Sequence, residues 1–149
     1  MDIRTTSSIN KILLAAGWYE KRAIDVRNIY DFLTSEGFVW GSTIETFLRE
    51  FGNLSYSFVD KDFQRQIFHF SPLVALAGIH KGWVLNDYAP RVNKDLCIIG
   101  QARNGYMTLS MAKDGSVYGG YDDFLCYIGE NGEKAIENLV NEVDLVEID

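Results

Sequence analysis

The spacing of apolar residues divides the chain into a helical first third and a strand-rich remainder. Up to Gly52, apolar positions recur every three to four residues, which is the period of a helix that buries one face. A glycine follows each of the three apolar segments, and glycine readily adopts the left-handed backbone that ends a helix. The pattern therefore predicts three short helices that end at Gly17, Gly37 and Gly52.

Each predicted helix has its own apolar stripe and local signals for its start. The residues that we expect to point inward are Ile9, Ile12, Leu13 and Ala16 in the first helix, Val26, Ile29, Tyr30 and Leu33 in the second, and Ile44, Phe47, Leu48 and Phe51 in the third. Asp25 is placed to cap the second helix, and Ser42 followed by Glu45 has the pattern of a capping box.

Beyond Gly52 the period changes to two, which is typical of strands with one buried face. The segments "NLSYSF" and "RQIFHFS" predict an antiparallel pair joined by a polar loop, with Leu54, Tyr56 and Phe58 on one face of the first strand. Three further strands are predicted at "LCIIG", "YMTLSMA" and "SVYGGY". The last two of these meet at a tight turn in which Gly115 takes a positive φ.

The segment 71–92 between the two groups of strands is less regular. It indicates one or two short helices, interrupted near Gly78 and Gly82 and ended before Pro90. A final helix is predicted from Glu133 to Asn141. The order of elements predicts an α+β fold, in which N-terminal helices pack on a mostly antiparallel sheet of about five strands, with a helical insert and a C-terminal helix. We expect a single domain over residues 1–149.

Composition and charge narrow the function classes. The sequence has no apolar run long enough to cross a membrane and no secretory signal, so we expect a cytoplasmic protein. Cys97 and Cys126 lie among apolar neighbours, as free thiols do in a reducing compartment. From Lys113 onward there are 2 basic against 10 acidic residues, whereas the chain before it carries 12 against 11. Such an acidic segment repels nucleic acid and anionic membranes and attracts a cationic partner; the plainer interpretation is a solvated helix that favours solubility.

No catalytic motif emerges from the sequence. It has no nucleotide-binding glycine loop, no zinc-type spacing of cysteine or histidine and no glycine-flanked nucleophilic serine. His69 and His80 are interpreted as structural histidines, and the acidic pairs Asp60 with Asp62 and Asp122 with Asp123 as solvated loop residues. We therefore expect neither an enzyme nor a bound metal or cofactor. An enzyme is the weaker alternative, and it would require a pocket in which His69 or His80 meets a carboxylate.

Several segments that contain these glycine stops and apolar stripes together resemble a known family. The runs "LLAAGWYEKRAID", "TFLREFGNLSYSF", "IIGQARNGYMTLSMAKDGSVYGG" and "IGENGEKAIENLV" are similar to the SUKH superfamily, and within it to the third group of bacterial toxin immunity proteins. The similarity extends from Leu13 to Val140, except for residues 64–94. The matching motif positions are Gly17, Trp18, Arg22, Phe47, Leu48, Phe51, Gly52, Leu54, Gly100, Gly115, Gly129, Ala135 and Leu139.

The resemblance implies a small α+β protein that neutralises a polymorphic toxin by binding its toxin domain in the producing cell, without an activity of its own. Many such toxin domains are nucleases with cationic clefts, and an acidic protein can occupy such a cleft. The expected partner is thus a cationic toxin domain, not nucleic acid or a membrane. The alternative is an adaptor of the same superfamily that binds a protein unrelated to any toxin.

The segment "AAGWYEKR" has two possible roles. We interpret Trp18 as a plug that folds back over the first helix, with Arg22 holding the loop through a backbone carbonyl or a carboxylate. The alternative is that Trp18 and Tyr19 anchor a partner. The contact residues that we predict instead come from polar and aromatic loops; they are Trp83, Asp87, Tyr88, Tyr121, Asp122 and Asp123.

Overall fold

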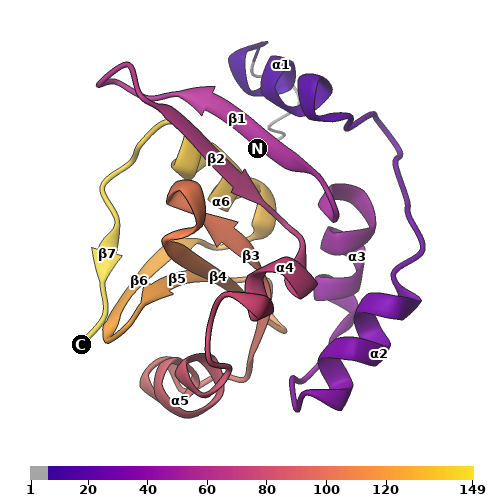
Figure 1. Cartoon of the computed structure of the whole chain (residues 1–149), viewed down its shortest axis with the longest axis vertical. Coiled ribbons are helices and arrows are strands. Elements are labelled where there is room, and N and C mark those ends of the chain that lie inside the picture. The colour runs from indigo at the N-terminus through magenta and orange to yellow at the C-terminus, as the bar shows by residue number, and fades with distance from the viewer. Residues whose placement is uncertain (1–6) are drawn as a thin grey trace.

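A computed structural model of the chain describes residues 7–149 (Figure 1). Its helical elements are α1 (Ser7–Ala16), α2 (Arg27–Ser35), α3 (Ser42–Phe51), α4 (Pro72–Ala77), the π-helix η2 (Trp83–Tyr88), α5 (Ala89–Val92), the 3₁₀ turn η3 (Arg103–Gly105) and α6 (Gly132–Val140). The strands are β1 (Ser55–Val59), β2 (Arg65–His69), β3 (Leu96–Ala102), β4 (Met107–Ala112), β5 (Val117–Tyr121), β6 (Phe124–Gly129) and β7 (Val146–Glu147).

The strands form one antiparallel sheet in the order β1-β2-β3-β4-β5-β6-β7, so each strand pairs with its neighbour in sequence. The predicted α+β class is confirmed, but the sheet has seven strands instead of about five. The missed strands are β6 and β7. The β6 sequence "FLCYIG" is an apolar run without alternation, because both of its faces are largely buried. The two residues of β7 are too few to produce a period.

The sheet opens between β2 and β3. These strands share one bridge, His69 with Gln101, whereas β1 and β2 pair along their whole length. The β1–β2 hairpin therefore diverges from the rest of the sheet, as Figure 1 shows. Gly100 permits the close approach of β2 and β3 at this bridge, because a Cβ at this position would collide with the carbonyl group of His69.

The N-terminal helices follow the predicted stops closely. Gly17 and Gly37 have φ values of +105° and +96° and end α1 and α2 in the left-handed region. Gly52 differs, since its φ is −68° and the left-handed residue is Asn53. A glycine is still needed at position 52, because a Cβ there would collide with the Leu48 carbonyl oxygen.

The helix starts and one inward face depart from the predictions. Helix α3 begins at Ser42 itself after Gly41, and no side chain caps it, so the predicted capping box is wrong. Asp25 accepts a hydrogen bond from the backbone N–H of Arg27 at 2.9 Å, but the N-cap residue of α2 is Val26 and no side chain caps it, so the predicted cap at Asp25 is also wrong. Tyr30 is exposed and packs edge-on against Trp40, because it lies at the margin of a stripe whose centre is buried.

The helical insert breaks at Gly78, which caps the C-terminus of α4, and resumes at Gly82. It then continues through Pro90 to Val92, so the predicted end before Pro90 is wrong. The proline lies in the first turn of α5, directly after the π-helical turn of η2. The missing N–H of Pro90 thus coincides with the change from π-helical to α-helical bonding.

The segment after α1 packs into the core. Trp18 is 4% exposed, its ring stacks on Phe51, and its indole N–H donates to the Glu50 carboxylate at 3.1 Å. The Arg22 guanidinium donates to the Glu50 backbone carbonyl at 2.7 Å. By contrast, Tyr19 is 58% exposed. The segment thus joins α1 to the end of α3 through packing and two hydrogen bonds.

The remaining motif positions also belong to the frame. Phe47, Leu48 and Phe51 are buried and Leu54 is half-buried. At Gly129 a Cβ would lie 2.7 Å from the Ala135 nitrogen, so the glycine lets α6 pack closely on β6. In α6, Ala135 and Ile136 are buried, whereas Leu139 and Val140 are half-buried. Within residues 7–149, no helix is long and apolar enough to span a membrane.

The two cysteines are free thiols in the core. Burial raises the pKa of Cys97 to about 12 and that of Cys126 to about 11. Both thiols therefore stay protonated near neutral pH and pack as small apolar side chains.

Candidate functional site

The six predicted contact residues come from two segments that the fold brings together, η2 and the turn between β5 and β6. The Tyr88 hydroxyl donates to the Asp122 carbonyl at 2.7 Å. Arg91, one turn beyond Asp87, donates to the Asp123 carbonyl at 2.9 Å and to the Asp87 carboxylate at 3.1 Å. The β5–β6 turn is thereby tied to the helical insert.

Tyr88 itself is not available for contact with a partner, since it is 1% exposed and Trp83 stacks on it. This corrects its place among the predicted contact residues. The buried side chain instead supports the β5–β6 turn through its hydrogen bond to the Asp122 carbonyl. Burial, with the nearby carboxylates of Asp87 and Asp122, raises the pKa of Tyr88 to about 12, so the hydroxyl remains a donor. Trp83 and Asp87 are half-buried.

The other three predicted residues form the accessible part of this region. Tyr121 is 44% exposed and stacks on Phe124 across the turn, which limits its rotamers. Asp122 and Asp123 are exposed, and Asp122 adopts a left-handed φ of 49°. The carboxylates therefore project into solvent from a turn of fixed shape.

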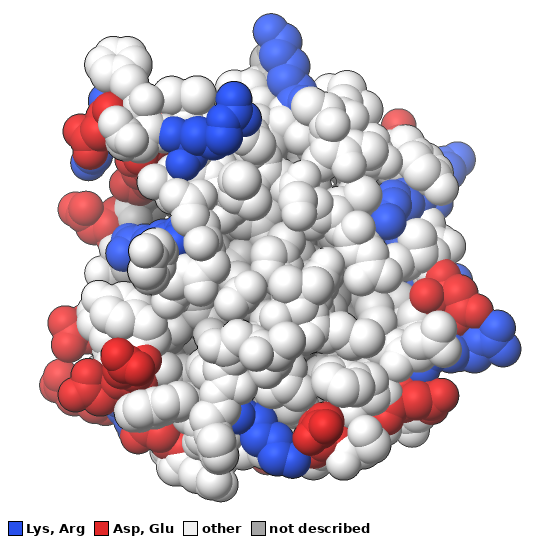
Figure 2. All heavy atoms as spheres, viewed as in Figure 1, with Lys and Arg blue, Asp and Glu red and all other residues white. Residues whose placement is uncertain are grey.

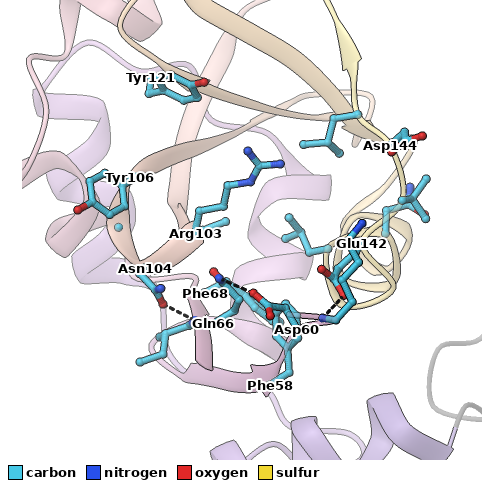
Figure 3. A pocket seen from close by; sticks show the side chains of 18 of the residues that line it. Phe58, Asp60, Gln66, Phe68, Arg103, Asn104, Tyr106, Tyr121, Glu142 and Asp144 are labelled. Carbon is cyan, nitrogen blue, oxygen red and sulfur yellow. Dashed lines mark hydrogen bonds between the residues drawn. The ribbon is translucent and has the colours of Figure 1, made fainter. Parts of the chain in front are cut away.

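Tyr121 and Asp122 also line a groove of about 940 Å³ (Figure 3). The other walls come from the β1–β2 hairpin, the β3–β4 turn and the segment 138–145, which runs from the end of α6 toward β7. The divergence of the hairpin from the sheet opens this space. The lining therefore combines loops with residues of β2 and the end of α6, and it includes the buried core residues Phe68 and Ala102.

The β3–β4 turn has an unusual backbone. Arg103, Asn104 and Gly105 have φ values of 50°, 57° and 94°, so three consecutive residues are left-handed. The Asn104 side chain fastens this turn to β2: its Oδ1 accepts from the Ile67 N–H at 2.8 Å and its Nδ2 donates to the Arg65 carbonyl at 3.3 Å. The carboxamide thus makes the hydrogen bonds to the β2 backbone that a neighbouring strand would otherwise make.

Two of the carboxylates in the groove are used within the protein. Asp60 accepts from the backbone N–H groups of Asp62 and Gln64 and from the Gln66 amide, all at 2.9 Å, and these bonds lower its pKa. Glu142 accepts from the Lys61 N–H at 2.9 Å. Both carboxylates thus shape the groove by fixing the tip of the hairpin.

The remaining charges in the groove are not paired. Within the described chain, no hydrogen bond or ion pair engages the side chains of Arg103, Asp122 or Asp144. Figure 3 shows the Arg103 side chain extending into the groove. Acidic side chains gather at the lower left of Figure 2, on the side where the C-terminal end of the chain lies in Figure 1.

Exposed apolar side chains surround the groove. Tyr106 is 81% exposed, Ile67 and Val143 are also exposed, and all three line it. Phe63, at the tip of the β1–β2 hairpin, is 87% exposed. Exposed aromatic residues next to unpaired charges are typical of surfaces that bind other proteins.

Sequence reasoning located part of this site and missed its centre. Tyr121 and Asp122 were predicted, whereas Arg103 and Tyr106 were not. The signal was present in "QARNGYM", where polar residues, a glycine and a tyrosine separate two apolar strands. That pattern indicates a turn, but it does not reveal which other loops lie beside it.

The histidines serve structural purposes. The backbone N–H of Ser71 donates to Nδ1 of His69, so Nε2 carries the proton and donates to Gln101 Oε1 at 2.9 Å. His80 accepts through Nδ1 from the Gly82 N–H. Among residues 7–149, no three His, Cys, Asp or Glu side chains are grouped so as to hold a metal ion.

The groove and the β5–β6 turn thus have the make-up of a binding surface on an α+β frame. The chain belongs to the SUKH-3 immunity protein family, which matches residues 5–142. The comparisons with curated proteins and with solved structures gave no match. Family membership indicates a role in toxin immunity, and the match includes the groove-lining segments up to Glu142.

Proposed function

We propose that this protein binds and neutralises a cognate toxin domain in the bacterial cytoplasm, and that the groove with the β5–β6 turn is its contact surface. The observation that carries the proposal is the combination of exposed Tyr106 and Tyr121 with the unpaired charges of Arg103, Asp122 and Asp144 in one groove. A partner that buries this surface pairs charges that the isolated protein leaves solvated.

The toxin domain that fits is cationic, and a nuclease is the class we propose. The chain carries a net charge of −7, and the groove-lining residues include four carboxylates against Lys61 and Arg103. A negative surface attracts a phosphate-binding cleft over distances longer than direct contact. Neutralisation then results from occlusion of the cleft, without chemistry by the immunity protein.

Co-expression with the toxin domain encoded beside this gene tests the proposal. We expect the protein to restore growth and to co-purify with a catalytically inactive form of the domain. A double variant, Tyr106→Ala with Tyr121→Ala, should lose protection while remaining folded, because both side chains are exposed. Tyr19→Ala is the matched control for loss of an exposed tyrosine outside the groove.

The outcomes separate the candidate functions. Growth arrest despite soluble protein would contradict toxin immunity and favour the adaptor function. Protection by the double variant equal to that of the parent would keep immunity but remove the groove as its contact surface.

A further inference from the structure

We propose that Arg103 is the central anchor of the groove and pairs with one carboxylate of the toxin domain. In the toxin domain, this carboxylate is surrounded by basic side chains, which face the acidic rim of the groove. The acidic rim consists of the groove-lining carboxylates Asp60, Asp122, Glu142 and Asp144. The inference rests on the proposed function and specifies its chemistry. It predicts a partner surface with alternating charge, where a single acidic residue lies within a cationic region.

The first observation is the placement of the guanidinium. Arg103 extends from the β3–β4 turn into the groove (Figure 3), and no side chain of the described residues forms an ion pair with it. Asp144 lines the same groove, yet no ion pair joins it to Arg103. An arginine that stays unpaired beside carboxylates retains its five donors for an incoming group.

The second observation is that the turn is held before any partner arrives. Arg103 lies in the left-handed region, and the two hydrogen bonds of Asn104 to β2 fix the residue that follows it. A side chain on a fixed backbone loses less conformational entropy on binding than one on a mobile loop. Tyr106, three residues further on, adds an exposed aromatic surface that lines the same groove.

The charges around Arg103 decide which anion is accommodated. Asp60, Asp122, Glu142 and Asp144 all line the groove, and they repel a polyanion such as nucleic acid. A single carboxylate flanked by lysine or arginine fits this groove, because the carboxylate pairs with Arg103 and its basic neighbours pair with the acidic rim. Arginine is suited to this pairing, because its planar fork binds a carboxylate through two parallel hydrogen bonds.

Nuclease clefts contain this arrangement, since the carboxylates that hold metal ions or activate water lie among phosphate-binding cations. Because Arg103 points into a groove, the carboxylate that it pairs with is one on a part of the toxin domain that enters this groove. Inhibition then arises because the bound protein covers the cleft beside that carboxylate.

The probe is the toxin domain encoded beside this gene, inactivated at a residue other than Asp or Glu so that every carboxylate is kept, and the test measures its dissociation constant. We expect Arg103→Gln to weaken binding at least about thirtyfold, as for a central anchor. Arg103→Lys should give a smaller loss, because it keeps the charge but not the fork. Arg27→Gln, on α2 and outside the groove, makes the same change in net charge and should alter the constant by less than about twofold.

A double-mutant cycle identifies the carboxylate. Each Asp or Glu of the toxin domain is replaced by Asn or Gln and measured against the parent and Arg103→Gln. We expect one replacement that weakens binding to the parent about tenfold or more but has almost no further effect on Arg103→Gln.

The results distinguish this inference from the proposed function. If Arg103→Gln binds as tightly as the parent, the anchor is wrong while toxin binding stands. If the variant loses affinity but no carboxylate couples to it, the assigned partner group is wrong. Binding of a short RNA or DNA by the parent, abolished in Arg103→Gln, would also overturn it. Failure of the parent to bind the domain removes the proposed function and the inference together.

Discussion

At the scale of single residues, Trp18 shows how one side chain joins two helices. Its ring stacks on Phe51, and its indole N–H donates to the carboxylate of Glu50, on the last turn of α3. The Arg22 guanidinium donates to the backbone carbonyl of the same residue. We interpret this loop from the sequence as a plug, with a binding site as the alternative, and the Trp18 ring is buried against Phe51 of α3. The groove lies elsewhere on the molecule.

We predict that Trp18→Ala lowers the free energy of unfolding by about 3 to 5 kcal/mol, the range for emptying a buried aromatic site. Chemical denaturation of parent and variant measures the difference. Tyr19→Ala serves as the control and should cost less than about 0.5 kcal/mol, because that ring is exposed. A stable Trp18→Ala variant with collapsed toxin affinity would instead identify Trp18 as a contact residue.

Asp114 gives a pH-dependent prediction in the β4–β5 turn. Hydrogen bonds from the Ser116 hydroxyl and backbone, together with Lys94, lower its pKa to about 2. A carboxylate with a lowered folded-state pKa contributes stability above its unfolded pKa of about 4, and that stability is lost as the pH falls toward 2. The stability difference between the parent and Asp114→Asn should therefore shrink between pH 4 and 2.

The size of this effect is at most about 1 kcal/mol, because the Asp114 side chain is 55% exposed and water screens its ion pair. Urea denaturation at a series of pH values measures it. Ser116→Ala removes one donor and should reduce the same pH dependence. A difference between parent and Asp114→Asn that is constant from pH 6 to pH 2 would disprove the assignment.

At the scale of elements, two turns each place a glycine at a positive φ, one in open space and one in a packed site. Gly115 and Gly105 have φ values of +93° and +94°, but a Cβ at Gly115 would lie 3.2 Å from the Thr43 methyl, whereas a Cβ at Gly105 would meet nothing within 4 Å. We predict that Gly105→Val costs about 1 to 2 kcal/mol from backbone strain. Gly115→Val should cost more, since Thr43 must also move. Thermal unfolding of both variants compares the two costs, and equal values would show that Thr43 adapts freely.

The elements also show how far the sequence predicts the fold. Helices α1, α2 and α3 were found because period and glycine stops are local signals, and the β1–β2 hairpin because its alternation is regular. Strand β6 escaped because burial on both faces removes the alternation. The groove could not be derived, since it depends on the single bridge between β2 and β3 and on loops distant in sequence.

At the scale of the whole molecule, we expect charge to govern how a partner approaches. The acidic last quarter of the sequence contributes the exposed Asp122 and Asp123 on the β5–β6 turn, and Asp144 in the groove. Solvated carboxylates accelerate encounter with a cationic domain more than they tighten the final complex. Their influence reaches about 8 Å at physiological ionic strength.

Reversal of both turn charges, Asp122→Lys with Asp123→Lys, should slow association with the toxin domain about tenfold or more at low salt and much less at high salt. Association rates measured against ionic strength test this. The control is Asp31→Lys with Asp95→Lys, two exposed carboxylates outside the groove. Unchanged rates at low salt would exclude steering by the turn, and a defect only in dissociation would mean that the aspartates are buried in the complex.

The Asn104 carboxamide has a consequence for self-association. Where β2 diverges from β3, its backbone presents an unpaired edge, and such edges recruit strands from other copies of a chain. Asn104 satisfies the Ile67 N–H and the Arg65 carbonyl at that edge with a group that cannot propagate a sheet. The groove thereby stays open at this point without an unsatisfied β2 edge that could pair with a strand of another copy.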